Sequence, residues 1–182
     1  MRDLRSAIRL HEEMKRSAYL AFFLICLPLT GFAQKLDASI GWDYEDSKQN
    51  TGTAVLNGWY GSLSYNVLPR LGLTVEHESY WGQSQGGQRT NDHAWLGGVT
   101  WNLLSSEHKI IPFIQPLVGT TRSSGSGEVD YDLTFQVAGG VNVKLKGPVS
   151  LQLTPVEYVA TRIHGLNYNS YGAAAGFQFS FK

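Results

Sequence analysis

The sequence predicts an all-β protein, an eight-stranded antiparallel up-and-down transmembrane β-barrel. The strongest observation is the last run, residues 170–182, in which aromatic or apolar side chains alternate with small or polar ones. Successive residues of a strand point to opposite faces, so one face of this strand is apolar and the other is not. The apolar face comprises Tyr171, Ala173, Ala175, Phe177, Phe179 and Phe181. A barrel in a membrane needs such a pattern, with apolar groups against lipid and polar groups inside.

Seven earlier runs support the same fold. The clearest alternation covers residues 36–45, 71–76, 95–103, 133–143 and 150–154, and a weaker run covers 53–66. The run Ile110–Thr120 alternates poorly, because Pro112 and Pro116 each remove a ladder donor. We expect a bulge or an irregular rung there and leave the facing of this strand open. Eight is the smallest strand number that closes into a barrel filled by side chains.

The connections predict which way the barrel is oriented. Segments 66–70, 104–109 and 144–148 read as tight turns, whereas segments 47–52, 82–92, 121–130 and 162–167 read as longer polar loops. Short turns at one end and long loops at the other are typical of outer-membrane barrels. An even number of strands then places both termini on the periplasmic side.

The first 33 residues read as an export signal preceded by a short extension. Ala18–Leu29 is an apolar run of signal-peptide length that follows two basic residues, and small residues precede a predicted cleavage after Ala33. Met14 is the predicted start. Cys26, the sole cysteine, lies in this segment, so the mature chain is expected to carry no thiol ligand. The predicted division is a leader, 1–33, and a barrel, 34–182.

Aromatic side chains are predicted to form two belts, as the two interfaces of a bilayer select. One set lies near the expected outer rim and the other near the periplasmic rim: Trp42, Tyr44, Trp81, Trp95, Tyr158 and Tyr171 in the first, and Tyr65, Trp101, Phe179 and Phe181 in the second. A soluble β-sandwich with core aromatics is the alternative interpretation.

The polar face of the strands predicts the contents of the interior. It collects Asp37, Asp43, Glu45, Thr74, Glu76, Glu78, Gln136, Asn142, Gln152 and Arg162. Buried acids need partners, so we expect water or the loop residues Arg89 and Arg122 to assist Arg162. Structural packing is the favoured interpretation of this network, and a small conductance or a ligand path is the alternative.

Three polar residues fall on the predicted lipid face: Asn57, His77 and Glu157. Glu157 is expected close to the outer interface, where an acid costs little. His77 is expected nearer mid-depth, where it is tolerable if neutral or if a bulge turns it inward.

The signal segment, the eight runs and the terminal residues Gly176–Phe181 together resemble the small outer-membrane β-barrel domain family, which includes OmpX-like and OmpA N-terminal-like proteins. The segment 155–162 looks like the start of the last hairpin of such domains. The resemblance implies a monomer in the outer membrane of a Gram-negative cell envelope, in contact with lipid and lipopolysaccharide. It also implies insertion by the barrel-assembly machinery, which reads a C-terminal strand, here the one that carries Tyr171, Phe177, Phe179 and Phe181. Lys182 after the last aromatic departs from that signal.

These observations predict a non-enzymatic outer-membrane protein with a structural or surface-interaction role and no cofactor. One alternative is a lipid A-modifying hydrolase that uses His77 and Ser79, which share a face, with an acid to orient the histidine. Another is a soluble lipocalin-like binder with its apolar face inside. His93, His108 and His164 lack metal-ligand spacing, and no basic cluster suggests nucleic acid.

Overall fold

The computed structural model describes residues 36–49, 52–83, 89–125, 128–163 and 166–181. The predicted leader, its cleavage site and the start of the barrel domain at residue 34 lie outside these residues. Nowhere in the described ranges is there a helix with the length and apolar character that crossing a membrane requires.

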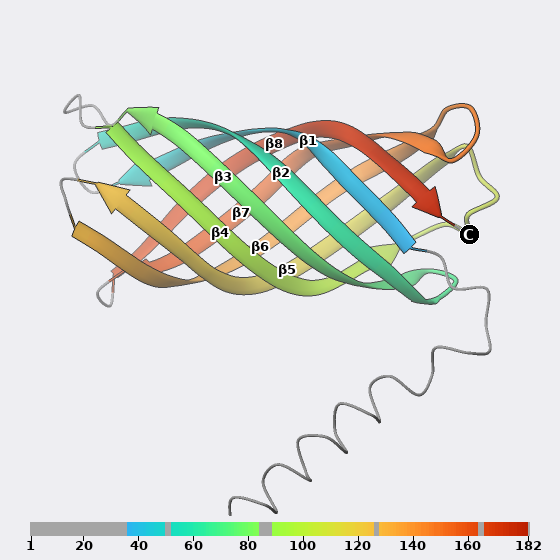
Figure 1. Cartoon of the computed structure of the whole chain (residues 1–182), viewed down its shortest axis with the longest axis horizontal. Coiled ribbons are helices and arrows are strands. Elements are labelled where there is room, and N and C mark those ends of the chain that lie inside the picture. Colours follow the sequence, from blue (N-terminus) through green and yellow to red (C-terminus); the bar gives the residue numbers. More distant parts are fainter. Residues whose placement is uncertain (1–35, 50–51, 84–88, 126–127, 164–165, 182) are drawn as a thin grey trace, which may run out of the picture. The chain divides into compact units, whose positions relative to one another are not determined.

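Eight antiparallel strands close into one barrel, as predicted (Figure 1). Each strand pairs with the next in sequence, and the first pairs with the last, from Leu36 opposite Phe181 onward. The strands are β1 (Leu36–Gln49), β2 (Gly52–Leu68), β3 (Leu71–Gln83), β4 (Arg89–Asn102), β5 (Ile110–Gly125), β6 (Glu128–Lys144), β7 (Val149–Ile163) and β8 (Leu166–Phe181). We call the end of the barrel where β1 begins and β8 ends the terminal end.

The predicted difference in loop length is wrong. At the end opposite the terminal end, β5 runs to Gly125 and β6 begins at Glu128, and these two residues still pair. The longest gap between strands, residues 103–109, lies at the terminal end instead. The prediction took polar segments rich in Gly, Ser, Asn and Gln to be loops, but a hairpin ladder is made by backbone groups and continues through polar side chains.

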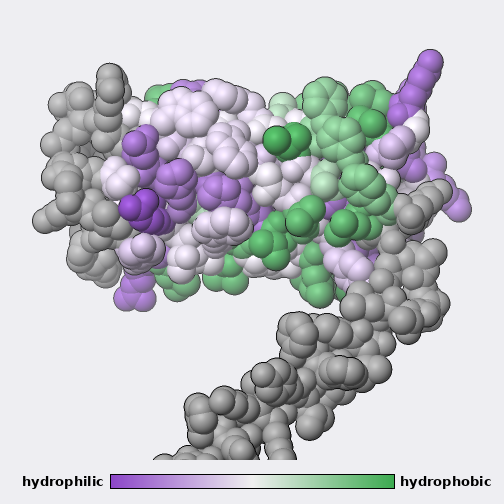
Figure 2. Space-filling view, in the orientation of Figure 1, coloured by the Kyte–Doolittle hydropathy of each residue, from purple (hydrophilic) through white to green (hydrophobic). Residues whose placement is uncertain are grey.

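The apolar stripes face outward and the polar stripes face inward. Trp101 and Phe177 are about half exposed on the outer surface, at 55% and 48%, whereas Gln136 is 0% exposed. In Figure 2, hydrophobic side chains gather on the outer surface toward the terminal end, and hydrophilic ones lie at both ends. This is the reverse of the lipocalin-like alternative, which needs its apolar face inside.

The facing of β5, left open by the sequence, is regular. Ile111, Phe113, Gln115 and Leu117 are buried inside the barrel, and the two prolines alternate with them. The expected irregular rung is present in β5, and it is not a bulge. Its ladder to β4 is interrupted between the pairs Gly98–Leu117 and Trp101–Ile114, with no change of register. A missing proline N–H thus removes pairing here without displacing the strand.

The irregularity that matters for the interior lies in β7. Thr154 pairs with Ala174 and Glu157 with Gly172, so Pro155 and Val156 together stand opposite a single residue of β8. Both bulged residues are exposed, and the next side chain, Glu157, is turned inward to 4% exposure. The prediction that Glu157 faces lipid is therefore wrong, because one extra residue reverses the alternation beyond it.

The same bulge corrects a second prediction. Arg162 was expected inside the barrel, and it is exposed. Its neighbour Thr161 points inward instead and bonds with Thr134, at 3.2 Å between the hydroxyl oxygens.

Candidate functional site: the barrel interior

The structure places nine of the ten residues predicted for the interior inside the barrel. All nine are buried: Asp37, Asp43, Glu45, Thr74, Glu76, Glu78, Gln136, Asn142 and Gln152. Arg162 is the exception. The nine do not form one continuous cluster: most of them lie in or beside two layers of different chemistry, and Glu157 joins one of these layers.

The first layer lies midway along the barrel, and we call it the acidic layer: Asp43, Glu78, Tyr80, Gln136 and Glu157. The Gln136 amide Nε2 donates to Glu78 Oε1 at 2.9 Å and also to Glu157 Oε1. The Tyr80 hydroxyl donates to Asp43 Oδ2 at 2.7 Å. Each of these five side chains is at most 5% exposed. Four strands are therefore tied together across the interior by side chains alone.

Two glycines make room for this layer. A Cβ on Gly58 would lie 2.6 Å from Cδ1 of Tyr80, and a Cβ on Gly172 would lie 3.3 Å from Oε2 of Glu157. Glycine at these inward positions lets a large or charged side chain of a neighbouring strand lie flat against the backbone.

Apolar side chains and one further acid complete the middle of the interior. Ala94, Leu96 and Leu117 form a small apolar cluster on β4 and β5. Glu76 accepts a hydrogen bond from Gln115 Nε2 at 3.1 Å. The interior at this level is filled with side chains, as expected of an eight-stranded barrel.

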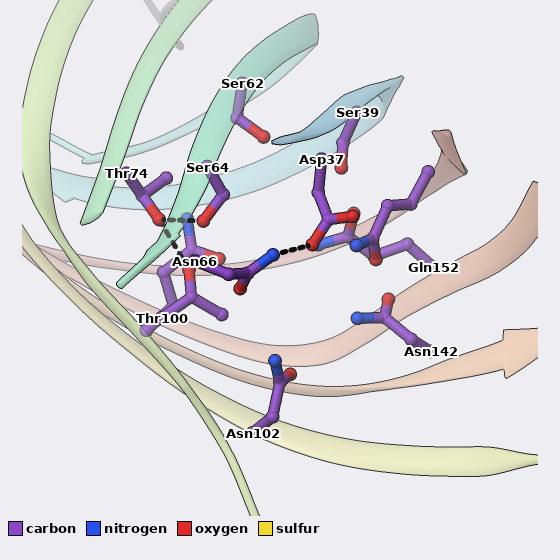
Figure 3. Close-up of a pocket in the computed structure, with 12 residues that line it drawn as sticks. Asp37, Ser39, Ser62, Ser64, Asn66, Thr74, Thr100, Asn102, Asn142 and Gln152 are labelled. Carbon is purple, nitrogen blue, oxygen red and sulfur yellow. Dashed lines mark hydrogen bonds between the residues drawn. The ribbon is translucent and has the colours of Figure 1, made fainter. Parts of the chain in front are cut away.

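The second layer lies at the terminal end, and we call it the neutral layer: Asp37, Ser64, Asn66, Thr74 and Thr100, which are hydrogen-bonded as Figure 3 shows. Asn66 Nδ2 donates to Asp37 Oδ2 at 2.7 Å, and Thr74 Oγ1 lies 2.7 Å from both the Ser64 and Thr100 hydroxyl oxygens. Hydroxyl and amide groups predominate, and Asp37 is the only ionisable group among these five.

A small cavity opens among the neutral-layer side chains. It is also lined by Asn102, Asn142 and Gln152, whose amide oxygens are buried without a hydrogen-bond partner among the described residues. A small polar cavity of this kind suits about one ordered water molecule, which would donate hydrogen bonds to these amide oxygens. The terminal end of the interior is therefore suited to hydration, unlike the acidic layer.

Basic side chains do not balance the acids. Among the side chains that the structure describes, no lysine or arginine is buried. Arg89 and Arg122 were expected to pair with the buried acids. Arg122 is exposed, whereas the side chain of Arg89 lies outside the described residues. The buried carboxylates are Asp37, Asp43, Glu45, Glu76, Glu78, Asp132 and Glu157.

The outer face holds the residues of the predicted hydrolase site. His77 does face outward, and no bulge turns it in: its ring centroid lies 4.3 Å from that of Trp95, and its Nδ1 is 3.0 Å from the Ala94 carbonyl oxygen. His77 pairs with Gly61 and Trp95 on the neighbouring strands, and Ser79 pairs with Trp59 and His93. Glu78, the acid between them in the sequence, points into the barrel and away from both.

Sequence reasoning missed the inward tyrosines and the inward Glu157. Tyr60 and Tyr80 occupy the polar phase of their strands and are 4% and 5% exposed. Tyr60 and Tyr80 are at even positions, and the even positions of β2 and β3 form the inner face that also holds Glu76 and Glu78. The alternation of side chains could therefore have predicted that both tyrosines point inward. For Glu157 the signal was Pro155, since a proline inside a strand marks a bulge.

Comparison with known proteins supports the fold. No family model and no curated protein matches the sequence. Neisserial surface protein A matches structurally with a TM-score of 0.67 and 15% identity, over 81% of this chain and 97% of that one. The chain has the fold of a small outer-membrane β-barrel. Two Pseudomonas aeruginosa proteins agree: OprG (TM-score 0.55, 8% identity, 82% and 96% covered) and the N-terminal barrel domain of OprF (0.51, 14%, 80% and 97%). At these identities the likeness concerns the fold.

Proposed function

We propose that this chain is a non-enzymatic protein of the bacterial outer membrane, with a structural or surface-interaction role. The observation that carries the proposal is the pairing of an apolar outer surface with a filled polar interior. A protein in water would leave large residues such as Trp95, 61% exposed, and Leu133, 60% exposed, in contact with solvent around the barrel. Burial of that surface in lipid removes the unfavourable free energy of exposing it to water.

The interior supports a closed barrel rather than a pore. The Gln136 amide bridges β3 and β7, and the Tyr80–Asp43 bond bridges β3 and β1, at the same level of the barrel. Ion flow would require these buried bonds to break together. We therefore expect no steady conductance from the protein in planar bilayers, and discrete open-channel currents would contradict the closed state.

The last strand is the proposed contact for the barrel-assembly machinery. Tyr171, Phe177 and Phe181 are 55%, 48% and 54% exposed on the outer surface of β8, and Phe179 is 37% exposed. After insertion the same side chains would contact acyl chains, with lipopolysaccharide around the opposite end. A monomer suffices, because the barrel closes on itself and leaves no sheet edge.

Membrane fractionation with a heat-modifiability gel tests this proposal. Expressed in a Gram-negative host, the chain should sediment with the outer membrane and run as a compact band that shifts on boiling. Recovery from the periplasm without detergent would overturn the proposal.

The non-enzymatic part has its own test. Outer membranes from cells that express the chain should show lipid A with unchanged acylation by mass spectrometry. Loss of an acyl chain that depends on Ser79, tested with Ser79→Ala, would restore the hydrolase alternative.

A further inference from the structure

Three carboxylates meet inside the acidic layer although they are distant in sequence. Asp43 comes from β1, Glu78 from β3 and Glu157 from β7, and each is at most 4% exposed. One carboxylate oxygen from each lies within 4.8 Å of the other two. Calcium binds oxygen at about 2.3–2.6 Å, so a single ion can contact oxygens separated by that much. The geometry is therefore compatible with one shared cation.

The surroundings of the three carboxylates supply little to oppose their charge. Their hydrogen-bond donors are neutral, the Gln136 amide and the Tyr80 hydroxyl. No described lysine or arginine side chain is buried. Carboxylates this close in a medium of low dielectric constant must gain protons or a cation.

Unsatisfied oxygens at the same place favour the cation. Asp43 Oδ1 and Gln136 Oε1 are buried, and neither has a hydrogen-bond partner among the described residues. Gln136 is 0% exposed, and its Nε2 already contacts Glu78 and Glu157, so its carbonyl oxygen borders the cluster. A proton shared between carboxylates would leave this amide oxygen unsatisfied, whereas a metal ion can take it as a ligand.

We propose that Asp43, Glu78, Glu157 and the Gln136 carbonyl form a Ca²⁺ site within the barrel. An all-oxygen donor set without histidine or cysteine selects a hard cation over a transition metal. Gln115 both lines the terminal-end cavity and bonds with Glu76, two residues from Glu78. Polar side chains thus lie between the cavity and the site. This inference holds wherever the barrel is located in the cell.

Calcium titration of the full chain, refolded in detergent and freed of metal with a chelator, tests the site. Isothermal titration should give saturable binding of about one Ca²⁺ per chain. Glu157→Gln and Glu78→Gln should each weaken binding at least tenfold, because each removes a charged ligand. Asp37→Asn is the matched control: it removes a buried acid from the neutral layer and should change the affinity less than twofold.

The possible outcomes separate the site from its alternatives. The compact band on a heat-modifiability gel identifies which variants are folded, and calcium should also raise the unfolding midpoint of the wild-type barrel but not of Glu157→Gln. An absence of saturable binding by the folded wild type overturns the proposal, since the carboxylates would then be protonated. Equal loss of affinity in Asp37→Asn also overturns it, because that result indicates diffuse attraction to the acidic interior.

Discussion

The acidic layer and the neutral layer fill the same barrel with different kinds of polar packing. In the acidic layer, the donors to the three carboxylates are Gln136 and Tyr80. In the neutral layer, Ser64, Thr74 and Thr100 exchange hydroxyl bonds beside a cavity. A hydroxyl can donate or accept, and water can replace a lost partner there. A buried carboxylate that loses its donor has no such replacement.

This difference indicates which buried polar side chains can be removed with little loss of stability. The free energy of unfolding should depend strongly on single groups in the acidic layer and weakly on single groups in the neutral layer. Buried polar groups stabilise a structure when every partner is present, and they destabilise it when one is removed.

The largest expected effect is that of Gln136→Leu. The change keeps a similar volume but removes the donor to Glu78 and Glu157, and it should lower the free energy of unfolding by about 3 kcal/mol. Reversible urea unfolding of the barrel in lipid vesicles measures it. Gln152→Leu, at a buried glutamine beside the cavity, is the matched control and should cost about 1 kcal/mol or less. Equal costs for the two variants would remove the distinction between the layers.

A smaller effect is expected from crowding the acidic layer. In Gly58→Ala the new Cβ would lie 2.5 Å from the Ser79 carbonyl oxygen and 2.6 Å from the Tyr80 ring. Displacement of Tyr80 should lower the free energy of unfolding by about 2 kcal/mol. Gly139→Ala is the control, because nothing lies within 4 Å of its added Cβ. If Gly58→Ala left the free energy of unfolding unchanged, the position of Tyr80 beside Asp43 would not contribute to stability.

The smallest effect is expected from Ser64→Ala in the neutral layer. The variant loses one hydroxyl bond to Thr74, which keeps a second bond to Thr100. Since water can take the vacated position, the loss should be about 0.5 kcal/mol in the same urea experiment. A loss as large as that of Gln136→Leu would mean that the neutral layer is as intolerant as the acidic one.

The alternation of side chains was sufficient to predict the strands and the direction of their faces. The inward position of Gln136 and Asn142 follows from a period of two, which any regular strand obeys. Closure was predicted from the number of alternating runs, since eight strands can close around an interior filled by side chains. What alternation cannot predict is a change of phase. Pro155 was visible in the sequence, but whether it causes a bulge depends on the partners of β7, and the bulge decides the positions of Glu157 and Arg162.

The meeting of three carboxylates in the acidic layer also could not be predicted from the sequence. Asp43, Glu78 and Glu157 lie on β1, β3 and β7, no two of which are neighbours, so their meeting depends on the closure and stagger of the whole barrel. The connections show a related limit. Polar hairpin ends read as loops, although the ladder between β5 and β6 continues to Gly125.

The most direct test of the central claim, that the apolar stripes face lipid, uses the unmodified protein. All five tryptophans, Trp42, Trp59, Trp81, Trp95 and Trp101, are exposed on the outer surface, at 39% to 61%. Reconstituted into bilayers whose acyl chains carry bromine, the barrel should lose most of its tryptophan fluorescence relative to unbrominated bilayers. Fluorescence that brominated lipid leaves unchanged would place these rings away from the acyl chains and contradict the account.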